Sequence, residues 1–415
     1  MSKNGKGSVF FNGLRQVIIV IIMMLIVGFL SYQAVFWYFK QGNQLGLKKT
    51  AIKNKDVVYT AMILDSDGEQ DNEGIIVRAI HPKTNNVDML VIPENTVISA
   101  SSKTYATLKE KGTILQEPMT IGDIATLVSS KTEQYELQVQ ALEELLGIEQ
   151  ISYYEAYDKS AFITIANLVP AQTMTVPMTI GNDSGVLLEQ GEQSLNGEQA
   201  YAVVSFGGYP NGTLDQGKLL AQFFHGYYCA FSQMTEEEKE QAYATYNKTV
   251  TTNESEKEQE QLKEYIEKAT KEQFHIAMIP GIENAGTYEL TTEQVSQTIK
   301  QIKENETAYT TEQDMSQFQV ESVSSSKDLV TKVYNGTRIE GLATEWVQTL
   351  RADGYNVIGA ANDTGEQKQK TIIYVKTEGT GLDLKAYFQG ADVVVDSSLE
   401  GIDIKIVLGL DQAHS

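Results

Sequence analysis

The sequence predicts an α/β protein in three parts: an N-terminal transmembrane helix, a mixed sheet flanked by helices, and a small C-terminal α/β domain. Residues 17–39 carry no charge, and strand-like apolar runs interrupted by helical patterns begin at residue 57. After a polar segment, short strands alternate with helices from residue 328. The chain has 415 residues and is 41% apolar, which is enough for more than one core.

The uncharged stretch 17–39 is the first element. Its length of 23 residues exceeds the ~20 that a helix needs to cross the hydrocarbon core. Aromatic side chains gather at its C-terminal end, as in an interfacial belt, namely Tyr32, Phe36, Trp37 and Tyr38. A cleaved signal peptide has a shorter apolar region followed by small residues. We therefore expect a signal anchor, with a cytoplasmic tail at 1–16 and a basic stalk at 40–56.

Charge is distributed unevenly along the chain. Residues 1–55 hold eight Lys and Arg and no acidic residue, whereas residues 56–415 hold 25 basic and 55 acidic residues, a formal charge of −30. A body this acidic repels polyphosphate, which argues against nucleic-acid binding. Basic residues flank the anchor on both sides, and the positive-inside rule alone favours a cytoplasmic body. Because long domains translocate largely regardless of flanking charge, this pattern leaves the orientation open.

Residues 57–305 form the predicted larger domain, which begins with three strands. Apolar runs predict strands at 57–64, 74–80 and 87–93, and the segment HPKTNN between the last two predicts a hairpin turn. Helical spacing or a capping box predicts helices at 133–146, 218–231, 235 onward, 259–269 and 291–302. Apolar runs at 160–169 and 200–206 are expected to form two more strands.

A polar segment without periodicity, 306–327, predicts a linker to the last domain, 328–411. In that domain, strands are expected at 329–334, 356–360, 371–376, 392–396 and 402–408, with helices at 341–352 and 382–388. Alternating strands and helices predict one sheet with two helices packed on it.

Several motifs resemble the LytR-CpsA-Psr (LCP) family. Segment 191–200, GEQSLNGEQA, is similar to the family's GEQxLxGEQALAYxRxR, and 87–96, VDMLVIPENT, is similar to its strand ending in IPRDT. The last domain resembles the LytR C-terminal domain at 333–336, VYNG, and 341–343, GLA. The resemblance implies a membrane-anchored enzyme facing the cell wall. Such an enzyme moves an anionic glycopolymer from a polyprenyl pyrophosphate carrier to peptidoglycan, with magnesium held by Asp residues.

The sequence departs from the family pattern where the family has arginines. Guanidinium groups clamp pyrophosphate in bidentate fashion, but the matching positions hold Glu94, Ser205, Gly207 and Ala221. Two like charges about 4 Å apart repel by ~4 kcal/mol at an effective dielectric of 20, so Glu94 would oppose a pyrophosphate. Lys218 replaces a further arginine, and Gln222 is kept. Arg78, the only arginine in 57–305, matches no arginine of the motif and is expected on a strand.

The acidic part of the family site is better preserved. By the resemblance, Asp67 matches the first Asp of the family, and Glu73 stands where the second is found. Both belong to segment 65–73, DSDGEQDNE, which has five carboxylates at alternate positions. Hard cations prefer such ligands, yet the glycine at the sixth position of an EF-hand loop is missing. Two interpretations stay open: a solvated acidic hairpin tip, or a site for magnesium or calcium.

No other motif indicates a cofactor or a catalytic arrangement. Cys229 stands alone in an aromatic run that predicts burial. The four histidines are scattered without the spacing of a zinc site, at His81, His225, His275 and His414.

The replaced arginines favour a non-catalytic LCP relative: a membrane-anchored extracytoplasmic cell-envelope protein that acts in binding, scaffolding or regulation of glycopolymer assembly. Its expected partners are the lipid bilayer, a polyprenyl lipid, wall polymer or other envelope proteins. The alternative is an active glycopolymer phosphotransferase that keeps Asp67, Lys218 and Gln222, with a metal at Asp67 and Glu73. In both interpretations the resemblance implies that the body lies outside the cell.

Overall fold

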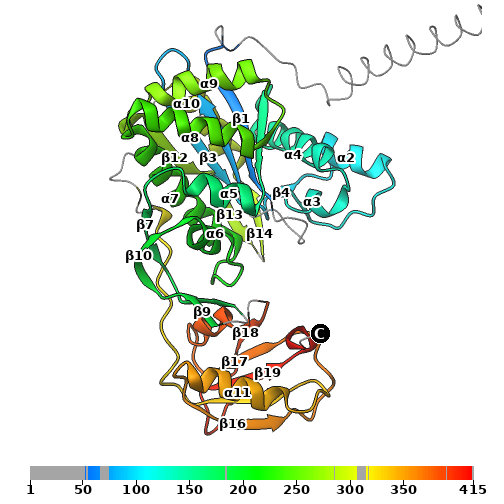
Figure 1. Cartoon of the computed structure of the whole chain (residues 1–415). Coiled ribbons are helices and arrows are strands. Elements are labelled where there is room, and N and C mark those ends of the chain that lie inside the picture. Colours follow the sequence, from blue (N-terminus) through cyan, green and yellow to red (C-terminus); the bar gives the residue numbers. More distant parts are fainter. Residues whose placement is uncertain are drawn as a thin grey trace, which may run out of the picture. The chain divides into compact units, whose positions relative to one another are not determined.

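The computed structural model describes residues 52, 55–65, 74–182, 185–284, 286–305, 315, 317–388 and 390–413. The predicted anchor at 17–39 and the acidic segment 66–73 lie outside these residues. Within the described residues, no helix combines the length and the apolar composition needed to cross a membrane. Two sheets, each with its own core, organise the described chain (Figure 1).

A six-stranded mixed sheet forms the centre of the larger domain. Its strands are β1 (Val58–Leu64), β2 (Gly74–Ile80), β3 (Val87–Ile92), β6 (Tyr153–Tyr157), β11 (Thr251–Thr252) and β12 (Phe274–Met278). They lie in the order β11-β6-β1-β2-β3-β12. Every residue of β1, β2 and β3 is buried, which explains why these strands are nearly continuous apolar runs.

The predicted hairpin between β2 and β3 is confirmed. The His81 amide donates to the Asn86 carbonyl at 2.9 Å, and Asn85 has a φ of 60°, which Asn tolerates in turns. β2 is antiparallel to β1 and to β3, whereas β6 is parallel to β1 and β12 is parallel to β3. The carboxyl ends of β1, β3, β6 and β12 therefore meet at one end of the sheet, here called the carboxyl edge.

Helices are packed around this sheet. They are α2 (Lys103–Glu110), α3 (Ile124–Leu127), α4 (Lys131–Leu146), α5 (Lys159–Ala166), α6 (Gly197–Ser205), α7 (Thr213–Ser232), α8 (Glu236–Thr249), α9 (Glu256–Lys268) and α10 (Thr292–Lys303). The capping box predicted at Thr235 opens α8, where Thr235 and Glu238 bond each other's backbone amides. Gly147 ends α4 in the left-handed conformation, as a C-cap glycine does.

The strands predicted at 160–169 and 200–206 are wrong, because both segments form helices, α5 and α6. Asp158 caps α5 by accepting a hydrogen bond from the Ala161 amide at 2.7 Å. Asn196 and Gln199 form a capping box that starts α6. Short apolar runs fit a buried strand and a buried helix equally well, so the polar caps decide the outcome.

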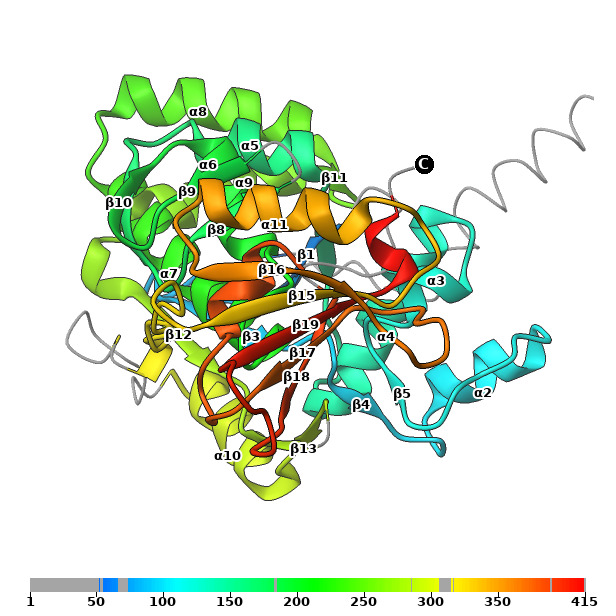
Figure 2. The ribbon, with the colours of Figure 1, turned by 90° about the horizontal axis from the view of Figure 1, so that it is seen from below.

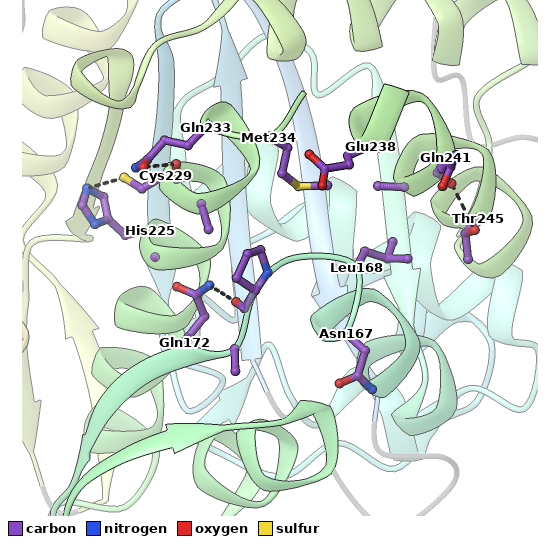
Figure 3. A pocket seen from close by; sticks show the side chains of 15 residues that line it. Asn167, Leu168, Gln172, His225, Cys229, Gln233, Met234, Glu238, Gln241 and Thr245 are labelled. Carbon is purple, nitrogen blue, oxygen red and sulfur yellow. Dashed lines mark hydrogen bonds between the residues drawn. The ribbon is translucent and has the colours of Figure 1, made fainter. Parts of the chain in front are cut away.

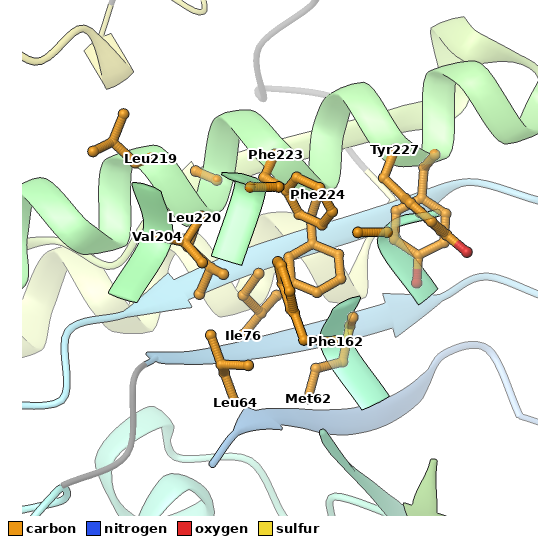
Figure 4. Close-up of a cluster of buried hydrophobic side chains, with 14 of the residues drawn as sticks. Met62, Leu64, Ile76, Phe162, Val204, Leu219, Leu220, Phe223, Phe224 and Tyr227 are labelled. Carbon is orange, nitrogen blue, oxygen red and sulfur yellow. The ribbon is translucent and has the colours of Figure 1, made fainter. Parts of the chain in front are cut away.

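The main core lies between the sheet and α7. Phe223 and Phe224 of α7 stack around Phe162 of α5, with ring centroids 4.8 and 6.3 Å away. Below these rings lie Met62 and Ile76 of the sheet (Figure 4). The predicted aromatic and aliphatic face of this helix is confirmed as its buried side.

Short strands and the segment after α10 complete the larger domain. The strands are β4 (Val97–Ile98), β5 (Met119–Thr120), β7 (Gln172–Val176), β8 (Ile180–Asn182), β9 (Gly185–Leu188), β10 (Gly191–Leu195), β13 (Gly281–Asn284) and β14 (Thr287–Leu290). Phe318, Val320 and Val323, from the segment predicted as a linker, are buried in the main core. The described part of this segment is therefore packed against the domain.

The C-terminal domain is a five-stranded sheet with one α-helix. Its elements are β15 (Thr331–Asn335), α11 (Leu342–Ala352), β16 (Val357–Asn362), β17 (Ile372–Val375), the 3-10 helix η4 (Leu382–Ala386), β18 (Asp392–Val395) and β19 (Ile404–Leu408). The strand order is β16-β15-β19-β17-β18 (Figure 2). Trp346 of α11 packs on Phe388 at 4.6 Å between ring centroids, inside a core that includes Val333 and Ile406. The predicted sheet with two helices is confirmed, the second being 3-10.

Candidate functional site

The beginning of α7 lies against the carboxyl edge of the central sheet. A side-chain carbon added at Gly217 would make ordinary contacts of 3.4 Å with Val91 of β3 and Met278 of β12, so the start of α7 lies close to the ends of both strands. Lys218 follows directly and is half-buried. The fold thus places Lys218 of the predicted residual site near the ends of β3 and β12.

Asp215, an acidic residue of the same helix, lies close to the charged group of Lys218. Nζ of Lys218 lies 3.9 Å from Oδ1 of Asp215, whose side chain is only 1% exposed. Asp215 in turn accepts hydrogen bonds from the backbone amide and the side-chain amide of Asn211, at 3.0 and 3.2 Å. Asp215 therefore holds the turn before α7 and also offsets the cation beside it.

The other family positions on this side supply no further cation. Ala221 is buried, Ser205 ends α6 and is half-buried, and Gly207 is exposed. Gln222 donates through Nε2 to the carbonyl oxygen of Phe318 at 2.6 Å. The glutamine that the family pattern keeps is therefore used here to hold the segment that follows the domain.

Negative charge gathers after β3, where the family motif has its arginine. Glu94 is half-buried in the turn, and its carbonyl oxygen accepts from the Gly122 amide at 2.9 Å. The Asn95 side-chain amide donates to both carboxylate oxygens of Glu283, at 3.1 and 3.2 Å. The sequence motif identified Glu94, but only the fold brings Glu283 of β13 to the same turn.

Asp65, at the end of β1, is a functional candidate that the sequence reasoning missed. It is 3% exposed, and its two oxygens accept from Nζ of Lys131 at 2.6 Å and from the Tyr135 hydroxyl at 2.5 Å. Burial and the neighbouring Asp65 raise the pKa of Tyr135. The signal was available in the sequence, since Asp65 opens the acidic segment and Lys131 opens α4.

The predicted metal ligands Asp67 and Glu73 lie outside the described residues. In the part of the chain that the structure describes, no three His, Cys, Asp or Glu side chains lie close enough together to hold a metal ion. The described carboxylate nearest to them in sequence, Asp65, is already engaged by Lys131 and Tyr135. The described residues by themselves therefore do not form a magnesium site.

Between the sheet and α7–α9 lies a buried arginine cluster, defined as Arg78, Glu155, Tyr157, Tyr228 and Tyr246. Nη2 of Arg78 donates to Oε1 of Glu155 at 2.8 Å, and Nη1 donates to the Tyr228 hydroxyl at 2.9 Å. The hydroxyls of Tyr157 and Tyr246 both donate to Oε2 of Glu155 at 2.8 Å. Arg78 lies on a strand, as predicted, but its burial was not foreseen.

Burial and charge both act on the titratable groups around Arg78. Burial alone would lower the pKa of Arg78, but the charge of Glu155 and the neighbouring tyrosines together outweigh this effect and keep it well above its usual value. Burial, followed by the charge of Glu155, raises the pKa of Tyr157 and Tyr246. Arg78 is therefore a guanidinium, and both tyrosines are neutral phenols, throughout the physiological range.

The space beside this cluster is almost completely filled. A cavity of about 20 Å³ is lined by Arg78 and by side chains of α7, α8 and α9, among them Tyr227, Phe231 and Tyr243. Such a volume holds about one water molecule. Nε of Arg78 has no hydrogen-bond partner among the described atoms, which suits a single water there.

A larger recess of about 830 Å³ opens between α7, α8 and the segment after α5 (Figure 3). Its polar side chains are bonded locally: Gln172 donates to the Pro170 carbonyl at 2.7 Å, and Glu238 caps α8. Cys229, predicted to be buried, is half-buried on its wall, with Sγ 3.8 Å from Nε2 of His225. The recess carries no Lys or Arg in its lining, so it does not attract phosphate.

Comparison with protein families gives a match for the last domain. Residues 328–411 match the family described as LytR cell envelope-related transcriptional attenuator. The chain carries a LytR C-terminal domain. This match confirms the resemblance drawn from the motifs of that domain. A search of curated proteins found no match.

Solved structures are similar to the larger part of the chain. Bacillus subtilis TagV is 19% identical, with 60% of this chain and 98% of TagV covered, at a TM-score of 0.48. TagT bound to LI-WTA is 17% identical, with 64% of this chain and 97% of TagT covered, at a TM-score of 0.46. The LytR-Csp2A-Psr enzyme from Actinomyces oris is 14% identical, with 61% of this chain and 92% of that enzyme covered, at a TM-score of 0.46.

Proposed function

We propose that this chain is a membrane-anchored, extracytoplasmic cell-envelope protein that binds or scaffolds glycopolymer assembly without catalysing polymer transfer. The LytR C-terminal domain supports the envelope context, and the LCP motifs of residues 57–305 support a shared origin with the glycopolymer transferases. The predicted segment 17–39 supports the anchor.

The charge at the carboxyl edge is the observation that carries the non-catalytic function. A transferase must hold a pyrophosphate and neutralise the charge that develops on the leaving phosphate. At this edge Lys218 is offset by Asp215, while Glu94 and Glu283 add negative charge. The edge therefore repels the group that the transferase reaction requires.

The interior beside α7 supports the same conclusion. On the side of α7 that faces the buried arginine cluster, the packed side chains leave a cavity of about 20 Å³, so a polyprenyl chain that entered there would have to displace them. It would also have to break the hydrogen bonds of Glu155 in a region of low dielectric, which is costly.

Ligand-dependent thermal stability of the full-length protein in lipid nanodiscs tests this proposal. We expect no shift with a short-chain polyprenyl pyrophosphate, with or without magnesium. A ligand at 100 times its Kd would add ~2.7 kcal/mol of stability, which is readily measured. An active LCP enzyme in the same nanodiscs is the positive control. A magnesium-dependent shift specific to the pyrophosphate would overturn the non-catalytic function.

The second candidate, an active transferase, is favoured by one observation: Lys218 is retained as a partly exposed cation at the carboxyl edge. In that case Lys218→Ala would abolish the thermal shift, whereas Lys248→Ala, an exposed lysine at the end of α8, would not. Without a shift in the unchanged protein, the transferase is excluded by the same measurement.

The predicted topology has its own test. In a Cys229→Ala background, Ser324→Cys places a thiol at an exposed position of the segment before the last domain. An impermeant maleimide should label this thiol in whole cells. Labelling only after lysis would place the body in the cytoplasm and would overturn the envelope function as a whole.

A further inference from the structure

The sheet of the LytR C-terminal domain has one covered face and one open face. Side chains of α11 and η4, including Trp346 and Leu384, join Val333, Ile373 and Ile406 in the core. Residues that alternate with these along the strands point to the opposite face. In Figure 2 the five strands lie side by side, and no helix of this domain crosses in front of them.

Strand register places the polar side chains of the open face in two neighbouring rows. Lys405 of β19 is opposite Lys332 of β15 and Tyr374 of β17, which forms the first row. In the second row, Val407 of β19 is buried and is opposite Tyr334 of β15 and Ile372 of β17, so Tyr334 is the polar side chain among these three. We call Lys332, Tyr334, Tyr374 and Lys405 the tyrosine–lysine face.

These four side chains organise one another. Nζ of Lys405 lies 4.8 Å from the ring centroid of Tyr334 and 5.5 Å from that of Tyr374, and Nζ of Lys332 lies 5.3 Å from Tyr334. Cation–π contacts of this kind hold ammonium groups over ring faces. Two flat aromatic surfaces and two cations are therefore held together on three adjacent strands.

Acidic side chains border the face but do not cover it. Asp363, after β16, lies 3.8 Å from Lys405, and Asp392 stands at the outer end of the second row, on β18. Residues 328–411 as a whole hold eight basic and 13 acidic residues, a formal charge of −5. A polymer with closely spaced charges would be repelled by the rest of the domain, whereas a ligand with sparse charges would meet Lys332 and Lys405.

We propose that the tyrosine–lysine face binds a glycan strand whose peptide stems carry carboxylates, namely a strand of the peptidoglycan wall. Sugar rings present C–H surfaces that pack on tyrosine rings, and the phenol hydroxyls can bond sugar hydroxyls. Tyr334 and Tyr374 lie two strand spacings apart, or ~10 Å, which is comparable with the length of a disaccharide. Lys332 and Lys405 pair with the carboxylates. This inference rests on the proposed envelope location.

Binding of two labelled glycans to the full-length protein in nanodiscs tests the inference. One is an uncrosslinked peptidoglycan strand, and the other is chitohexaose, which shares the N-acetylglucosamine chemistry but lacks carboxylates. We expect the strand to bind more tightly than chitohexaose, with a difference that decreases as salt is added. Tyr334→Ala and Lys405→Ala should each weaken strand binding about tenfold.

Matched variants separate this site from general charge attraction. Lys327→Ala removes an exposed lysine whose Nζ lies over Tyr355, on the covered side of the sheet, and should leave affinity unchanged. Tyr334→Phe keeps the ring and should retain most of the affinity even if Tyr334→Ala fails to fold. Equal losses in Lys327→Ala and Lys405→Ala, or equal affinity for both glycans, would overturn the inference.

The same experiment separates the inference from the proposed function. Binding of empty nanodiscs or of a second copy of the chain through this face, with no glycan binding, would reject the inference and leave the envelope function standing. Cytoplasmic labelling of Ser324→Cys would instead reject the envelope function, whatever the affinity measured in solution.

Discussion

The buried arginine cluster and the tyrosine–lysine face use the same chemistry in opposite surroundings. Each combines cationic and tyrosine side chains: the cluster joins β2 and β6 with α7 and α8, and the face joins three neighbouring strands. In the cluster, Arg78 is 1% exposed and donates to Glu155 and Tyr228. On the face, Lys405 is 28% exposed by its side chain and lies over two rings.

The difference shows that burial decides what a cation beside tyrosines can do. Inside the domain, the low dielectric strengthens each electrostatic interaction, and a buried donor without an acceptor is costly. On the open sheet, water satisfies the same groups, which therefore stay available to a ligand. The buried arginine cluster therefore stabilises the fold, whereas the tyrosine–lysine face is the proposed surface for binding a ligand.

Removing Glu155 should produce the largest effect. Glu155→Ala leaves the buried guanidinium of Arg78 without its carboxylate, which should lower the free energy of unfolding by about 3–5 kcal/mol. Chemical denaturation measures this loss. The double variant Arg78→Met with Glu155→Leu should recover much of it, because apolar packing replaces the ion pair. A loss below about 1 kcal/mol would mean that water reaches the cluster.

Removing one hydroxyl from the cluster should cost less. Tyr228→Phe keeps the ring that stacks on Phe274 at 5.1 Å but removes the acceptor of Arg78 Nη1. We expect a loss of about 1.5–3 kcal/mol, since the bond involves a charged donor. Tyr334→Phe on the tyrosine–lysine face is the matched control and should be neutral in the same denaturation experiment.

Asp88 extends the comparison to a buried carboxylate. Burial would raise the pKa of Asp88, but hydrogen bonds from His275 at 3.1 Å and His81 at 2.7 Å outweigh it, so the pKa lies below its usual value. Its contribution to stability is present above the unfolded pKa of about 3.9 and is lost as pH falls through the lower folded pKa.

Asp88→Asn should therefore destabilise the protein by about 1.5 kcal/mol at pH 7. The difference in the free energy of unfolding between variant and unchanged protein should begin to narrow below pH ~4, where the unfolded chain binds a proton, and should close as pH falls through the lower folded pKa. Chemical denaturation at pH 7 and pH 3 measures this difference. A gap that stays constant from pH 7 to pH 3 would show that the charge of Asp88 contributes nothing.

The smallest effect is expected on the open face. Lys405→Ala should change the free energy of unfolding by less than about 1 kcal/mol, because its ion pair and cation–π contacts are partly exposed to water. The comparison fails if this variant is as unstable as Glu155→Ala. In that case the tyrosine–lysine face would be structural, like the cluster.

Much of the fold could be predicted from local sequence. β2 was located to the residue, and the hairpin followed from the turn chemistry of residues 81–86. α5 and α6 were mistaken for strands because their apolar runs are short, although Asp158 and Asn196 signal helix starts. In those two segments, the helix-capping residues indicate the structure better than the apolar pattern does.

The site was less predictable, because its contacts join residues far apart in sequence. Motif matching identified Glu94 and Lys218, but Glu283 reaches Asn95 from a hairpin 188 residues further on. Arg78 and Glu155 are 77 positions apart, and Tyr228 is 150 positions from Arg78. No periodicity within one segment encodes such pairs, so the buried arginine cluster could be found only in three dimensions.

The position of β1 has a mechanical consequence. β1 is the first described strand, yet it lies inside the sheet, with seven registered pairs to β2 and five to β6. With the proposed anchor before it, tension on the chain would be met first at Ile52, which is buried in the main core, and then at Val58. A pull along the strand loads both ladders at once, in shear, and does not open them one hydrogen bond at a time. If the anchor is confirmed, β1 is therefore well placed to resist unfolding under such a load.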